Sequence, residues 1–242
     1  MKSSLRIGTS GWNYKHWIGS FYPTKLKDSD WLSFYGSHFD TVEINNTFYR
    51  LPEEKTFKKW EEATKADFRY SVKVSRFITH IKRLKNIDDA LNLFLSRVSL
   101  LKNKTGPVLY QLPPSFKINM ERLESFLLLL PKNITHVIEF RNDSWFTDEV
   151  FVLLKKHHVS FCIHDMSNID CPCTETSSTI YIRFHGYEGV YEGSYSEDAL
   201  QKWVNYIKGK LKDGYDVYAY FNNDINAYAV ENAKTLKRML EK

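Results

Sequence analysis

The stretch TVEINNTFYRLP, residues 41–52, joins a short β-branched run to an abrupt polar turn. The run TVEIN (41–45) has the length and composition of a β-strand, yet it contains the carboxylate of Glu43. An unpaired carboxylate is costly to bury, so Glu43 lies either where the strand meets solvent or beside a cation. The place of this strand in the fold therefore decides what Glu43 can do.

Seven further segments are similar to this strand in length and composition. Each is too short for a typical helix and is rich in Val, Ile, Phe, Tyr or Thr. They are LRIGTS (5–10), FRYSVKV (68–74), PVLYQL (107–112), THVIEF (135–140), VSFCIHD (159–165), TIYIRF (179–184) and DVYAYF (216–221).

Amphipathic segments separate most of these strands, and Asp88 and Ser196 are placed to cap two of the helices that we expect there. The connection between the sixth and seventh strands, residues 166–178, is predicted to be a loop instead. Helical periodicity is clearest in residues 91–101, in residues 200–211, in the segment that begins at Thr147, and in residues 225–240.

Strict alternation of strands and helices predicts a parallel sheet. Eight such units in 242 residues favour an α/β fold, a (β/α)8 TIM barrel that forms a single domain over residues 1–242. An open doubly wound sheet is the alternative. No GxGxxG motif follows the first strand, which weakens the case for a dinucleotide-binding fold.

The composition is that of an ordinary globular protein, with 43% apolar and 26% charged residues. No run of about 18 apolar residues is present, so no membrane association is expected. The start, MKSSLRIGTSGW, lacks the apolar segment of a signal peptide, and three cysteines favour a reducing compartment, so we expect a cytoplasmic protein. A net charge of +5 favours the approach of an anion but is low for a dedicated nucleic-acid binder.

Polar residues gather at the carboxyl ends of the predicted strands. Residues two apart on a strand point to the same face, so these side chains converge on the upper mouth if that face is the lumen. Active sites of (β/α)8 barrels lie at this end. A layer of satisfied ion pairs without chemistry, such as Glu43–Lys73 or Glu139–Arg141, is the alternative interpretation. The residues are Glu43, Asn45, Lys73, Gln111, Glu139, Arg141, His164, Asp165, Arg183, His185, Asn222, Asn223 and Asp224.

Seven motifs in matching order give the chain a resemblance to the YecE-like family, also called domain of unknown function 72. The resemblance runs from residue 7 to about residue 235 and implies a TIM-barrel fold, but it brings no established activity or substrate. The main departure is CPC (171–173), whose cysteines are too close together for a standard zinc site. The motifs are IGTSGWNYKHWIGSFYP, VEINNTFYRLP, KVSRFITH, LYQLPPSF, IEFRNDSW, IRFHG and YFNND.

The predicted mouth suits acid/base chemistry on a small anionic substrate that bears a phosphate or a carboxylate. Glu43 and Glu139 are the expected acid and base, and His185 is the expected proton shuttle. The cations Lys73, Arg141 and Arg183 would stabilise charge. The reaction class stays open, with hydrolase or lyase first. Substrate-binding residues are expected to be Trp12, Tyr14, Asn45, Gln111, Arg183, Gly186, Asn222, Asn223 and Asp224, with the glycine-rich stretch RFHGYEGVYEGSY (183–195) helping to hold the anion.

Two other functions remain open. A metal-dependent nuclease or phosphodiesterase would need a divalent ion (Mg, Mn or Zn), although the rim cations could neutralise the same acids without one. A nucleotide- or RNA-binding module without chemistry is the other, and nucleic acid is not the favoured partner. No cofactor or oligomeric state follows from the sequence. The ligands for a metal would be Glu43, Glu139, His164, Asp165 and His185.

Overall fold

The computed structural model describes residues 3–166, 169–186 and 193–241 and contains eight parallel strands. Each strand lies where the sequence predicts it, and no strand end differs from the prediction by more than two residues. The strands are β1 (Leu5–Thr9), β2 (Thr41–Ile44), β3 (Arg69–Lys73), β4 (Thr105–Gln111), β5 (His136–Glu139), β6 (Ser160–Asp165), β7 (Thr179–Phe184) and β8 (Asp216–Phe221).

The strands form a nearly closed barrel. Their order is β1-β8-β7-β6-β5-β4-β3-β2, and every ladder is parallel. The seam lies between β1 and β2, where a parallel bridge joins Ser10 to Glu43. The barrel prediction is therefore confirmed, and the open doubly wound sheet is excluded.

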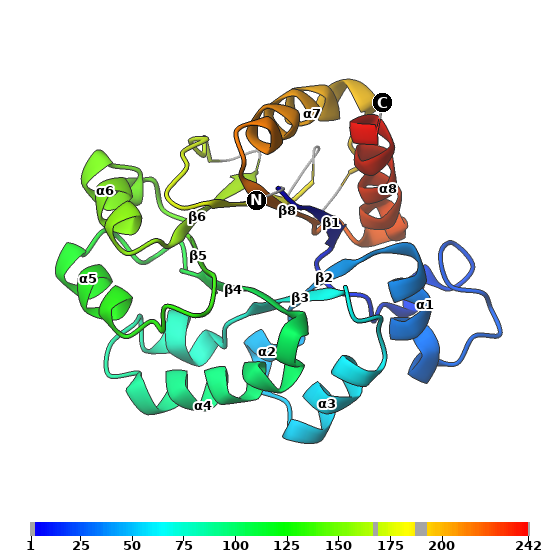
Figure 1. Cartoon of the computed structure of the whole chain (residues 1–242), viewed down its shortest axis with the longest axis horizontal. Coiled ribbons are helices and arrows are strands. Elements are labelled where there is room, and N and C mark those ends of the chain that lie inside the picture. The colour runs from blue at the N-terminus through cyan, green and yellow to red at the C-terminus, as the bar shows by residue number, and fades with distance from the viewer. Residues whose placement is uncertain (1–2, 167–168, 187–192, 242) are drawn as a thin grey trace.

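Helices surround the strands, as Figure 1 shows. Among the described residues between α6 and α7 there is no helix, and those of the connection 166–178 form a loop, as the sequence predicts (Figure 1). Within the described ranges, no helix is long and apolar enough to cross a membrane. The helices are α1 (Trp31–His38), α2 (Asn46–Tyr49), α3 (Glu54–Glu62), α4 (Asp88–Val98), α5 (Met120–Leu128), α6 (Asp148–Lys156), α7 (Glu197–Lys212) and α8 (Tyr228–Glu241), with a π-helical turn, η3 (Phe77–Ile81), after β3.

Of the two caps that the sequence predicts, Ser196 is confirmed and Asp88 is not, and Thr147, where the sequence predicts that another helix begins, is also a cap. The hydroxyl of Ser196 accepts a hydrogen bond from Ala199 N at 3.1 Å, and Thr147 caps α6 in the same way. Asp88 is not a cap: it is the first helical residue of α4, and Ile87 occupies the capping position. Its carboxylate instead lies in the first turn, where the helix dipole favours negative charge.

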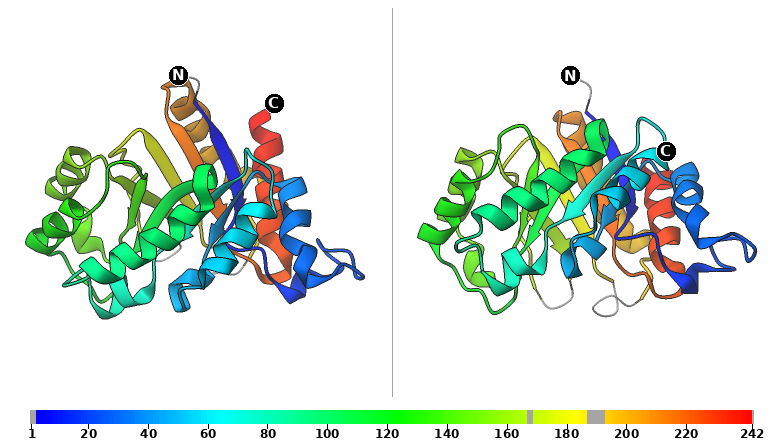
Figure 2. Two further views of the ribbon diagram at one scale, coloured as in Figure 1. Left: turned by 60° about the horizontal axis from the view of Figure 1, so that its bottom comes forward. Right: turned by 90° about the horizontal axis from the view of Figure 1, so that it is seen from below.

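The lumen of the barrel is packed with side chains. Five inward-facing residues form a buried cluster of their own, separate from the larger core between strands and helices: Leu109, Val137, Cys162, Tyr181 and Tyr220. A filled lumen of this kind is a core and not a pore. Figure 2 shows that β1 begins and α8 ends at the same end of the barrel.

Gly8 allows β1 and β2 to approach each other at the seam. A Cβ atom at Gly8 would lie 2.4 Å from the carbonyl oxygen of Thr41, which is closer than real atoms come. We expect Gly8→Ala to lower the free energy of unfolding by about 1–3 kcal/mol, because the backbone must shift at this seam. Urea denaturation followed by circular dichroism measures the change.

Gly209→Ala is the matched control, because Gly209 lies in α7 and its Cβ would have no neighbour within 4 Å. This variant should be more stable than the wild type by about 0.5–1 kcal/mol, since alanine favours a helix. Equal effects of the two substitutions would mean that β1 and β2 are not in close contact.

Candidate functional site

The strand registers direct the polar residues of the sequence prediction into the lumen. Gln111 is in register with Glu139, and His164 is in register with Arg183. Partners in a parallel ladder point to the same face, and Arg183 is also in register with Tyr220 of the lumenal cluster. The carboxyl ends of β4 to β7 therefore bring one layer of polar side chains together above that cluster.

Arg183 bridges two carboxylates at the centre of this layer. Its Nη2 donates to Glu43 Oε1 at 2.8 Å, and its Nη1 donates to Glu139 Oε2 at 2.7 Å. All three residues are at most 1% exposed. Glu43 also accepts from Ser10 Oγ at 2.7 Å and from Tyr181 OH at 2.6 Å. Glu43 is therefore a buried, fully paired group below the rim.

A second arginine extends the network toward the mouth. Arg141 donates through Nε to Glu139, and its Nη2 lies 2.8 Å from His185 Nε2. The other ring nitrogen of His185 lies 3.2 Å from the amide of Asn222. The predicted pair Glu139–Arg141 is thus present, whereas Glu43 pairs with Arg183 and not with Lys73.

The network fixes the protonation states of its members. Burial alone would raise the pKa of Glu139, but the charges of Arg141 and Arg183 outweigh it and hold that pKa well below its usual range. Burial and the same two arginines hold the pKa of His185 well below its usual range. Glu139 is therefore an anion and His185 is neutral near pH 7.

Lys73 stands apart from this network. Its Nζ lies 4.2 Å from the centroid of the Phe48 ring, and it has no carboxylate within ion-pair distance in the described part of the chain. Burial, and then the charge of Arg183, lower the pKa of Lys73 to about 7. A lysine in this state exchanges a proton readily at physiological pH.

His80 is a member of the site that the sequence did not reveal. It lies in the π-helical turn η3, and its ring packs edge-on against Phe48 with centroids 4.9 Å apart. Burial, and then the charge of Lys73, lower the pKa of His80 to about 4, so the ring is neutral near pH 7. The π-turn has no sequence period that would reveal it, and such turns recur at functional sites.

Ser10 and Tyr181 were also missed, although the sequence carries a signal for Tyr181. Tyr181 lies two residues before Arg183 on β7, and Ser10 follows β1 at the height of Glu43. The two-residue rule that selected Arg183 and His185 would have selected Tyr181 as well.

Three predicted binding residues lie next to members of the network, in the chain or in space. Asn45 has a buried side-chain oxygen without a hydrogen-bond partner among the described residues. Tyr14 donates from its hydroxyl to Ser10 O at 2.6 Å, and the side chain of the same serine donates to Glu43. Gln111 lies beside Glu139 in the sheet and is largely buried.

Other predicted residues have different contacts. Trp12 packs edge-on against Trp60 of α3. Asn223 donates to Gly193 O and to Asn232 of α8, both at 2.9 Å. The backbone oxygen of Asp224 accepts from Trp17 Nε1 at 3.0 Å and lies 2.8 Å from His16 Nε2. Gly186 donates its N–H to Tyr195 OH at 3.2 Å, and residues 187–192 of the glycine-rich stretch lie outside the described residues.

The residues considered as metal ligands do not come together as one set. His164 Nε2 lies 3.0 Å from Phe140 O, and Asp165 accepts from Trp203 Nε1 at 3.1 Å. Within the described ranges there is no group of three or more His, Cys, Asp or Glu side chains that could hold a metal ion. Glu43 and Glu139 are neutralised by arginines instead.

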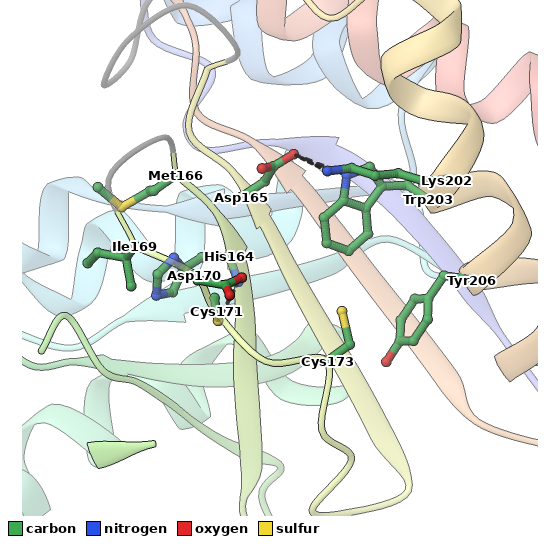
Figure 3. A pocket seen from close by; sticks show the side chains of 10 residues that line it. All are labelled: His164, Asp165, Met166, Ile169, Asp170, Cys171, Cys173, Lys202, Trp203 and Tyr206. Atoms are coloured by element: carbon green, nitrogen blue, oxygen red, sulfur yellow. Dashed lines mark hydrogen bonds and ion pairs between the residues drawn. The ribbon is translucent and has the colours of Figure 1, made fainter. Parts of the chain in front are cut away.

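A cleft of about 560 Å³ lies on the side of the barrel, between the connection after β6 and helix α7. Figure 3 shows Trp203 and Tyr206 of α7 on one side of the cleft, with Cys173 near Tyr206, and Met166 and Ile169 on the other side. Met166 lines this cleft, and its sulfur accepts from Arg141 Nη1. Burial raises the pKa of the Cys173 thiol and raises that of the Cys171 thiol to about 12, so neither thiol in the described lining is an activated nucleophile.

Comparisons with known proteins match nearly the whole chain. The family model described as "Protein of unknown function DUF72" matches residues 6–242. UPF0759 protein YunF of Bacillus subtilis (strain 168) is 26% identical over 272 residues, which cover 98% of this chain and 95% of that protein. UPF0759 protein YecE of Escherichia coli (strain K12) is 33% identical over 143 residues, which cover 59% of this chain and 50% of that protein.

A solved structure has the same fold. The crystal structure of a DUF72 family protein from Thermotoga maritima MSB8 is 28% identical, with a TM-score of 0.87, and the match covers 99% of this chain and 100% of that chain. The resemblance read from the seven motifs is therefore confirmed, and so is the barrel.

Arg183 is the residue whose loss should damage the lumen most. Arg183→Met would leave Glu43 and Glu139 buried without their shared cation, and we expect the free energy of unfolding to fall by about 3–5 kcal/mol. Urea denaturation at pH 7 measures it. The matched control is Arg238→Met, which breaks the exposed pair with Glu197 and should cost at most about 1 kcal/mol. A similar loss of unfolding free energy in both variants would contradict the claim that Arg183 bridges Glu43 and Glu139.

Proposed function

The chain belongs to the family described as protein of unknown function DUF72, and from that premise we propose that it is an enzyme acting on a small anionic substrate. The substrate bears a phosphate or a carboxylate and binds at the mouth formed by the carboxyl ends of the strands. The chemistry is proton transfer, of the kind that a lyase or a hydrolase uses.

The observation that carries this proposal is the balance of charge in the lumenal layer formed by Glu43, Lys73, Glu139, Arg141 and Arg183. The carboxylates of Glu43 and Glu139 are offset by Arg183 and Arg141. Lys73 is a further cation, and the described residues give it no carboxylate partner. Protonated Lys73 therefore leaves this layer with a surplus positive charge, which favours an anion.

The protonation states suggest a division of roles. Lys73, with a pKa of about 7, is a better candidate than Glu139 for the group that transfers the proton, because Arg141 and Arg183 keep Glu139 an anion. Glu139 positions Arg141, whose guanidinium is held at the mouth beside His185. Arg141 then contributes its remaining N–H donors to the bound anion, because guanidinium groups suit phosphate and carboxylate.

A metal-dependent nuclease or phosphodiesterase has less support. Both of the lumenal carboxylates that such a site would use already have arginine partners.

The three cysteines are free thiols, which supports assigning the enzyme to a reducing compartment, the cytoplasm.

Binding of sulfate tests the anion site, because sulfate stays doubly charged between pH 6 and pH 8. We expect Lys73→Met to raise the dissociation constant for sulfate about tenfold at pH 6, the effect of losing one charged partner. In the wild type, binding should weaken as the pH rises through about 7, because Lys73 then loses its proton. Isothermal titration calorimetry at several pH values measures both effects.

Lys58→Met is the control, since Lys58 is exposed on α3 and its loss changes the net charge equally. This variant should keep both the affinity and the pH dependence of the wild type. Sulfate affinity that is the same in all three proteins, or that does not change with pH, would refute an anion site at Lys73.

A further inference from the structure

The surroundings of Lys73 are those of an amine nucleophile as well as of a proton carrier. Lys73 is in register with Leu109, a member of the lumenal cluster, so its side chain enters the mouth from β3. The Phe48 ring covers its Nζ on one side, and the side chain is only partly exposed. Lysines that are desolvated beside other cations are the ones that enzymes use in covalent catalysis.

We propose that Lys73 forms an imine with the carbonyl group of a substrate that also carries a carboxylate or a phosphate. This inference deepens the proposed function and rests on it: the free N–H donors of Arg141 hold the charged end of the same molecule, and the fraction of Lys73 that is neutral attacks its carbonyl group. The substrate class is then an oxo-acid or the phosphate ester of a hydroxyketone. An imine withdraws electrons from the neighbouring carbon, which is the chemistry of a lyase.

The covalent step balances without any other reactant. The lone pair of the neutral Lys73 amine attacks the carbonyl carbon, and the carbonyl oxygen takes up a proton to give a carbinolamine. The nitrogen loses one proton, the hydroxyl group gains another, and water departs as the C=N bond forms. In sum, one amine, one carbonyl and one proton give one iminium ion and one water.

The neutral amine that this step needs is available at Lys73 near pH 7. A lysine with an ordinary pKa is unprotonated in only about one molecule in 2,500 at pH 7. The pKa of about 7 at Lys73 leaves roughly half of the molecules with a neutral amine. A lower pKa also makes an amine intrinsically less reactive, so the net advantage over a surface lysine is smaller, about tenfold or more.

His80 is placed to carry the protons. It packs on the same Phe48 ring that covers Lys73, and its pKa of about 4 keeps it neutral above that pH. We assign it the relay of the proton that the attacking nitrogen loses to the departing hydroxyl through a water molecule, and a ring with this pKa holds that proton only transiently because it is a weak base. We expect His80→Gln to slow imine formation about tenfold or more while leaving Lys73 as the labelled residue.

Trapping with borohydride tests the imine on the full wild-type chain. Pyruvate supplies a carboxylate next to a carbonyl, dihydroxyacetone phosphate supplies a phosphate, and acetone supplies a carbonyl with no charge. Borohydride reduces an imine to a stable secondary amine, and peptide mass spectrometry then locates it. We expect one of the two anions to label Lys73 at least about tenfold faster than the exposed Lys58, and acetone to label it at least about tenfold more slowly than that anion.

Lys73→Arg keeps the charge but cannot form the imine, so it should lose the label. Label spread over surface lysines, or none on Lys73 with either anion, would overturn the imine. If Lys73 of the wild type takes no label but sulfate still binds, the anion site stands without the imine. If Lys73 takes no label and sulfate does not bind, the proposed function is overturned as well. Labelling by acetone as fast as by the anions would overturn the assigned substrate class.

Discussion

The structure of the lumen depends on one buried arginine that two carboxylates share. Arg183 on β7 reaches Glu43, which is 140 residues away on β2, and Glu139, which is 44 residues away on β5. These contacts exist only when the strands close into a ring. Without them, two anions would be left in a dry interior at a cost of several kcal/mol. The barrel must therefore close for these charges to pair, and the charges must pair for the closed barrel to be stable.

This constraint determines what the mouth can do. Arg183 and Arg141 are used to neutralise the carboxylates, and tyrosines fill the lumen beneath them. Glu139 is consequently a fixed anion that orients its neighbours, and Lys73 is left in partial burial next to an aromatic ring. Proton transfer and covalent catalysis both become reasonable roles for that amine, because its two protonation states are close in free energy near pH 7.

The sequence predicts the strands and the gathering of polar residues at their carboxyl ends, because period-two patterns and strand ends are local properties. It also predicts that Glu139 and Arg141 share a face, since they are two residues apart. It does not predict that Glu43 prefers Arg183 to Lys73, because that choice depends on distances across the closed barrel. Asn223 follows Asn222 by one residue and therefore contacts α8 instead. His80 enters through a π-turn that leaves no periodic signal.

The most direct test of this account is the titration of Lys73 itself. Nuclear magnetic resonance of protein labelled with ¹³C at lysine Cε gives the pKa of each amine, and Lys73→Arg identifies the signal. We predict a midpoint near pH 7 that moves upward when sulfate is added, because a bound anion favours the ammonium ion. A midpoint near that of an ordinary lysine, unchanged by sulfate, would contradict the claim that the arginine network leaves a desolvated cation at the mouth.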